Sequence, residues 1–138
     1  MKNFLALFFI LSGNLYAKSC NDVQVRIIFE GKPAIAKETL CSKKTPDNML
    51  FYVSKSCDEN KCEILKRKKS ELEIKDYYSN IGSPGFKICN ELGGIPQIFE
   101  FSQGPNLWQS TERCLFGAKD FVEISLLTRE WINFLKKK

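Results

Sequence analysis

Residues 20–41, CNDVQVRIIFEGKPAIAKETLC, contain the clearest structural pattern in the chain. Apolar and polar residues alternate over 23–29, with Ile28 as the exception. A period of two is typical of a strand that buries one face. The Gly-Lys-Pro sequence at 31–33 indicates a turn, and 35–41 then reads as the returning strand. The stretch therefore predicts an antiparallel hairpin that begins and ends at a cysteine.

Further strand signals follow this hairpin. Short segments rich in apolar, aromatic or β-branched residues predict strands at 49–54, 62–66, 95–101, 107–116 and 121–124. Segment 71–78 is compatible with a strand or a helix, and its weak alternation favours the strand.

Two helices are predicted in the second half. The first starts with Ser83 as its N-cap and Pro84 at its first position, and it ends at Gly93. The second is capped by Ser125 and carries an apolar stripe that includes Trp131. The fold class predicted is α+β: one disulfide-stapled domain over 18–138, with an antiparallel β meander, a short helix, a hairpin and a C-terminal helix.

The first 17 residues, MKNFLALFFILSGNLYA, have the pattern of a secretory signal peptide. Lys2 supplies the positive charge, an apolar run covers 4–11, and Ala17 is the small residue before cleavage. A run of this length is well short of the roughly 20 residues that span a bilayer. We expect a periplasmic or secreted protein. A lipid anchor on Cys20 is the minor alternative, because Lys18 is unusual so close before a lipidated cysteine.

The composition limits the chemistry. The 138 residues include six cysteines and no histidine, which excludes catalysis by an imidazole and histidine-ligated metals. We expect no enzyme, no cofactor and no metal. The remaining alternative, a hydrolase with paired carboxylates, has several acidic candidates but no spacing that selects a pair. These candidates are Glu91, Glu100, Glu112, Asp120 and Glu123.

Residues 83–124 contain a motif of proline, glycine, cysteine and aromatic residues at characteristic spacings. Its matching positions, in order and spacing, are Pro84, Cys89, Gly93, Gly94, Cys114 and Phe116. This motif resembles a family of small secreted bacterial domains of unknown function that are often labelled haemolysin. Ser83 and Gly85 replace the family's Asn and Ala, and its later Cys and Trp are missing. The resemblance covers about a third of the chain and implies a fold and an exported location, but no catalytic residues.

An exported chain with an even number of cysteines predicts disulfides. Facing residues of an antiparallel hairpin have a constant sum of residue numbers. A turn near 31 therefore favours the Cys20–Cys41 pair, and a four-residue turn at 58–61 favours Cys57–Cys62. Cys89 and Cys114 remain, and the haemolysin resemblance independently implies that the helix is tied to the following hairpin.

A basic run at Lys66, Arg67, Lys68 and Lys69 is a candidate anion-binding patch. Its partner would be an anionic surface such as membrane phosphate or acidic polysaccharide, whereas nucleic acid is not expected in an exported protein of modest charge. The alternative is a solvated edge that prevents aggregation, because charged edge strands resist pairing.

These observations predict a non-catalytic binding or interaction module of the bacterial cell envelope. Its ligand is not specified, and another envelope protein is one candidate partner. The alternatives are a membrane-active, envelope-disrupting basic protein and a small secreted inhibitor of proteases or lysozyme.

Overall fold

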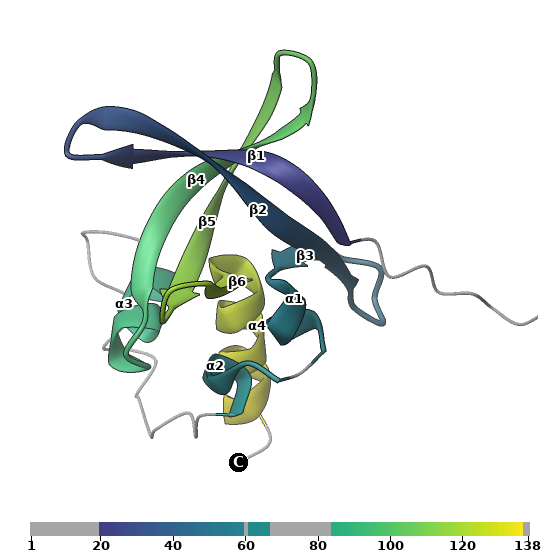
Figure 1. Ribbon diagram of the computed structural model, residues 1–138. Coiled ribbons are helices and arrows are strands. Elements are labelled where there is room, and N and C mark those ends of the chain that lie inside the picture. Colours follow the sequence, from purple (N-terminus) through teal and green to yellow (C-terminus); the bar gives the residue numbers. More distant parts are fainter. Residues whose placement is uncertain (1–19, 60, 67–83, 137–138) are drawn as a thin grey trace, which may run out of the picture.

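The computed structural model describes residues 20–59, 61–66 and 84–136 (Figure 1). The strands are β1 (Cys20–Phe29), β2 (Lys32–Lys44), β3 (Leu50–Val53), β4 (Ile95–Gly104), β5 (Leu107–Phe116) and β6 (Asp120–Glu123). The helices are α1 (Lys55–Asp58), α2 (Glu63–Lys66), α3 (Pro84–Glu91) and α4 (Ile124–Leu135). The predicted signal peptide and segment 71–78 lie outside the described residues.

The six strands form a closed antiparallel barrel in the order β1-β2-β3-β6-β5-β4. The predicted α+β meander is therefore wrong. The chain forms two three-stranded meanders, β1-β2-β3 and β4-β5-β6, and they join where β1 pairs with β4 and β3 pairs with β6. Each join connects segments that are far apart in the sequence, so no local pattern indicates it.

The β1–β2 hairpin agrees with the expected register. Cys20 faces Cys41, and Phe29 faces Lys32 at the closed end. The turn is one residue earlier than expected, at Glu30 and Gly31. Both residues have positive φ angles, 49° and 74°. Positive φ at both central residues is the mark of a type I′ turn, whose twist matches that of the two strands.

The join between β3 and β6 depends on side chains as well as on the backbone. Val53 and Val122 are its one ladder pair. Beside it, the Ser54 amide donates to the Phe121 carbonyl at 3.0 Å, and the Phe121 amide donates to Ser54 Oγ at 3.1 Å. The Tyr52 amide donates to a Glu123 carboxylate oxygen at 2.7 Å. Two short strands thus close the barrel with side-chain acceptors in place of a long ladder.

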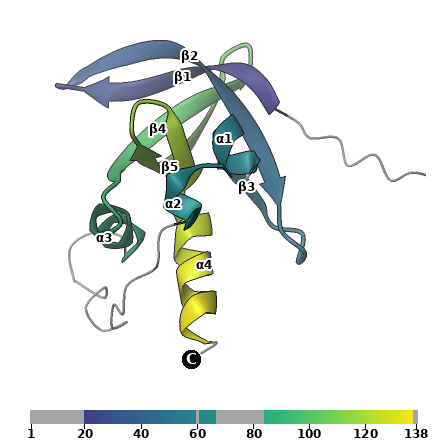
Figure 2. The same cartoon turned by 60° about the horizontal axis from the view of Figure 1, so that its bottom comes forward.

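The strands separate two apolar cores because their side chains alternate between the two faces. Leu40 belongs to the core inside the barrel, whereas the next residue, Cys41, belongs to the core beneath the helices. The inner core also contains the buried residues Val25, Phe99, Phe101 and Phe121. The outer core includes Val53, Ile64, Ile88, Cys114, Val122, Leu127 and Trp131. Figures 1 and 2 both show α3 and α4 at one end of the molecule, the tips of the β1–β2 and β4–β5 hairpins at the other, and α1 beside β3.

Helix α3 ends where the glycine pair predicted it to end. The Gly94 amide donates to the Cys89 carbonyl and the Gly93 amide to the Asn90 carbonyl, each at 2.9 Å, which is the Schellman pattern. Helix α4 begins at Ile124, one residue before the expected Ser125 cap. The Ser125 hydroxyl instead donates to Glu123 at 3.0 Å.

The segment after β3 contradicts the sequence interpretation. A hairpin with a turn at 58–61 and a strand at 62–66 was expected, but the chain forms the short helices α1 and α2. The amides of Asp58 and Glu59 donate to carbonyls four residues earlier, as in a helical turn. Cysteines five positions apart fit this turn, so Cys57 and Cys62 are bonded as expected, although the reasoning from a hairpin was wrong.

Candidate functional site

A cavity of about 610 Å³ lies against the inner core of the barrel, with Phe121 among its lining residues. Three parts of the chain border it: β2 at 37–39, the segment 54–56 that leads into α1, and the β5–β6 turn at 118–120. Ile27 and Leu115 provide apolar lining from the barrel strands. The volume lies within the roughly 300–1,000 Å³ range of small-molecule sites.

Arg113 is the central polar residue of this pocket. It belongs to β5, it is 2% exposed, and it points into the barrel rather than into solvent. Its guanidinium carbon lies 4.5 Å from the ring centre of Phe99 and 5.0 Å from that of Phe121. The cation is therefore held against two aromatic faces, a contact that is strongest when water is excluded.

Two polar side chains fix the guanidinium in its plane. Arg113 Nε donates to Gln97 Oε1 at 2.8 Å, and the two terminal nitrogens donate to the Glu38 carboxylate at 2.6 and 3.3 Å. These bonds use three of the five N–H groups of an arginine. Glu38 is about one-third exposed, so the ion pair connects the barrel interior to the pocket mouth. Such a pair offsets part of the cost of burying the charge.

The rim opposite β2 is held by the same contacts that close the barrel. Ser54 is buried and bonded to the backbone of Phe121. Next to it, the Ser56 hydroxyl donates to the Asp120 carboxylate. The start of α1 and the β5–β6 turn are therefore tied together, so this side of the pocket is preformed.

The pocket carries an excess of positive charge. Four cationic residues line it, and two acidic residues, Glu38 and Asp120, oppose them. The cations are Lys37, Lys55, Arg113 and Lys119. The three lysines are exposed, whereas the arginine is buried. Because Glu38 is paired with Arg113, three lysines stand against the single carboxylate of Asp120, and this excess favours a negatively charged ligand.

The expected anion-binding patch begins at Lys66, at the end of α2. Lys66 is the last residue of α2, and its side chain and Arg67, Lys68 and Lys69 lie outside the described residues. The patch stays a prediction. Sequence reasoning missed Arg113 and Glu38. The available signal was an arginine at an inward-facing position of β5. Its partner Glu38 could not be found in the same way, because Glu38 is on β2 of the other meander.

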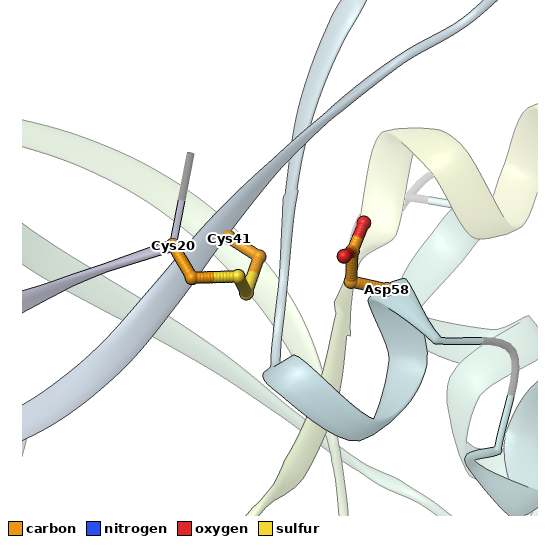
Figure 3. Close-up of side chains that lie close together, drawn as sticks. All are labelled: Cys20, Cys41 and Asp58. Carbon is orange, nitrogen blue, oxygen red and sulfur yellow. A yellow bond between two sulfur atoms is a disulfide. The ribbon is translucent and has the colours of Figure 1, made fainter. Parts of the chain in front are cut away.

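The six cysteines form the three expected disulfides: Cys20–Cys41, Cys57–Cys62 and Cys89–Cys114. Figure 3 shows the first of them near Asp58 of α1. The two sulfurs and the carboxylate lie close enough to hold a metal ion, but sulfurs bonded to each other are not thiolates. The oxidised protein therefore does not offer a metal site at this point.

The acidic candidates serve different contacts. Glu100 bonds to Arg26, Glu123 accepts bonds at the β3–β6 join, and Asp120 bonds to Ser56. Glu100 belongs to β4, whereas Asp120 and Glu123 are the first and last residues of β6.

Comparisons with protein-family models, with curated proteins and with solved structures gave no match. The three disulfides indicate an oxidising extracellular or periplasmic location. In the ranges that the structure describes, no helix is both long enough and apolar enough to cross a membrane.

Proposed function

We propose that this protein is an exported, non-catalytic binding module of the cell envelope and that its ligand binds in the pocket around Arg113. The observation that carries the proposal is a buried arginine that is fixed by Glu38 and Gln97 and lines a cavity of about 610 Å³. A polar group held in this way is preorganised, so ligand binding does not have to order it.

Export completes the proposal. Residues 1–17 act as a signal peptide that is removed after Ala17, and the mature chain is oxidised outside the cytoplasm. Mass spectrometry of the exported protein should therefore give Lys18 as the first residue. An exported species that retains Met1, or one that carries a diacylglyceryl group on Cys20, would contradict this assignment.

Binding at the pocket is tested by NMR with a fragment library that contains acids, neutral molecules and amines. We expect the largest backbone shifts at Leu115, Ala118 and Asp120, which line the cavity. Leu92, which follows α3 and belongs to the outer core, serves as the internal reference. Shifts confined to other surfaces, or no binding at millimolar fragment concentration, would contradict the proposed site.

A further inference from the structure

The long strand β2 has an open edge. It pairs with β1 from Lys32 to Cys41, but β3 pairs with it only from Cys41 to Lys44. Among the described strands, none pairs with residues 32–40 on the side away from β1. An unpaired edge of this kind is a template for a further strand, because its amide and carbonyl groups are already in line.

The hairpin geometry shows which backbone groups lie on the open side. Residues that close a two-residue type I′ turn form a hydrogen-bonded pair, and such pairs alternate with non-hydrogen-bonded ones. Phe29 and Lys32 close the turn and form a hydrogen-bonded pair. Pro33 is therefore in a non-hydrogen-bonded pair, and so is every second residue after it up to Cys41. Pro33 has no amide to donate, and Cys41 lies 4.0 Å from Cys20 between Cα atoms, which fits the close, non-hydrogen-bonded class.

Lys37 and Thr39 belong to this second class. Their amides and carbonyls therefore point away from β1, toward the open side of β2. Both residues also border the pocket. The open edge and the cationic pocket are thus neighbours, although they are independent observations: one comes from the strand register and the other from the side chains that line the cavity.

We propose that an acidic, extended segment of a partner protein adds to β2 as a further strand and places its carboxylates against the lysines of the pocket rim. This inference rests on the proposed function and names its partner class. The positive charge of Lys37, Lys55 and Lys119 complements the negative charge of the segment. Side chains of an added strand alternate between the two faces of the sheet, so a segment of alternating sequence carries all of its acidic residues on one face.

The same edge resists indiscriminate pairing. Lys32 and Pro33 stand at its hairpin end, and lysine and proline are the residues that natural edges use against aggregation. A second copy of this basic edge would meet like charge, whereas an acidic strand would not. The arrangement therefore selects by charge as well as by backbone hydrogen bonds.

The probe for the test is an acetylated, amidated hexapeptide of alternating valine and glutamate, titrated into the oxidised mature protein by calorimetry at low salt. A matched peptide with glutamine in place of glutamate removes the charge. Two further peptides carry N-methyl groups on alternate backbone amides: one on the odd-numbered residues and the other on the even-numbered residues. Only one phase of a bound strand turns its amides toward β2, so only one of the two should lose affinity.

We expect the glutamine peptide and one N-methylated peptide each to bind at least about ten-fold more weakly than the parent peptide. The other N-methylated peptide should bind nearly as the parent does. Lys119→Glu and Lys55→Glu should weaken binding and reduce its dependence on salt. Lys44→Glu, which makes the same charge change on an exposed residue of β2 outside the pocket, should leave the affinity unchanged.

Three results would overturn the inference: no binding of the parent peptide, equal binding of both N-methylated peptides, or equal binding of N-acetylglutamate α-amide, which keeps its side-chain carboxylate. The last would show that the pocket takes a small anion without adding a strand. If fragments still map to the pocket while the peptides fail, the proposed function stands and only the strand addition is wrong. If the peptides fail and the fragments bind only outside the pocket, both proposals are wrong.

Discussion

Gly94 shows how closely single residues are constrained in this fold. It follows α3 and lies against the Cys89–Cys114 disulfide. A Cβ at this position would lie 3.0 Å from Cys89 Sγ and closer still to Cys114 Sγ. Glycine is required here by space, whereas at the neighbouring Gly93 it is required by a φ angle of 82°.

Gly94→Ala should therefore lower the free energy of unfolding by about 1–3 kcal/mol, the usual cost of overpacking. Urea denaturation measures the change. The control is the same substitution in a protein that also carries Cys89→Ala and Cys114→Ala, where the obstructing sulfurs are absent. The cost should be clearly smaller there, and an equal cost in both backgrounds would contradict this explanation.

The Arg26–Glu100 pair makes a prediction about pH. Arg26 Nε lies 2.6 Å from Glu100 Oε2, and this hydrogen bond is the main cause that lowers the pKa of Glu100, with the arginine charge adding to it against desolvation. The folded pKa is below the unfolded one, so the ion pair contributes its full stabilisation above the ordinary carboxyl pKa, that is, above about pH 4–5. This stabilisation is lost as the pH falls through the folded pKa.

Arg26→Gln should raise the pKa of Glu100 back toward its ordinary value, as followed by carboxyl carbon shifts in an NMR titration. Asp47 is the internal control. Its pKa is lowered mainly by a hydrogen bond from Thr45 and also by Arg129, so it should not respond. An unchanged titration of Glu100 would show that Arg26 does not set its pKa.

At the scale of elements, the sequence predicts local pairing well and long-range pairing poorly. The β1–β2 register and the end of α3 follow from alternation, turn residues and a glycine pair, all within a few residues of the contacts they determine. The joins of β1 with β4 and of β3 with β6 depend on segments from different halves of the chain. Their contacts include a serine and a glutamate, Ser54 and Glu123, which carry no strand signal.

Each disulfide either links two secondary-structure elements or closes one short turn. Cys89–Cys114 spans 25 residues and joins α3 to β5, whereas Cys57–Cys62 spans five. In the loop-entropy model, the longer loop contributes about 3 kcal/mol and the shorter one less. All four sulfurs are buried, so removing either pair costs a similar amount of packing.

Calorimetry should therefore show a larger fall in melting temperature for Cys89→Ala with Cys114→Ala than for Cys57→Ala with Cys62→Ala. The second double variant is the matched control for lost sulfur contacts. A larger fall in the variant that lacks the short loop would refute the ranking by loop length.

At the scale of the whole molecule, the two meanders have the same plan. Each runs through three antiparallel strands and then enters a helix: β3 leads to α1, and β6 leads directly to α4. The pocket lies where the β2 edge of the first meander faces the β5–β6 turn of the second. The sequence could not predict this site, because its residues come together only when the barrel closes.

Amide hydrogen exchange tests most directly whether the edge of β2 beside this pocket is a binding site. In the free protein, the amides of Ala36 and Glu38 should exchange slowly because they pair with β1, and those of Lys37 and Thr39 should exchange fast. Saturation with the valine–glutamate peptide should slow Lys37 and Thr39. Protection of these two amides in the free protein, or no change when the peptide is bound, would contradict the account.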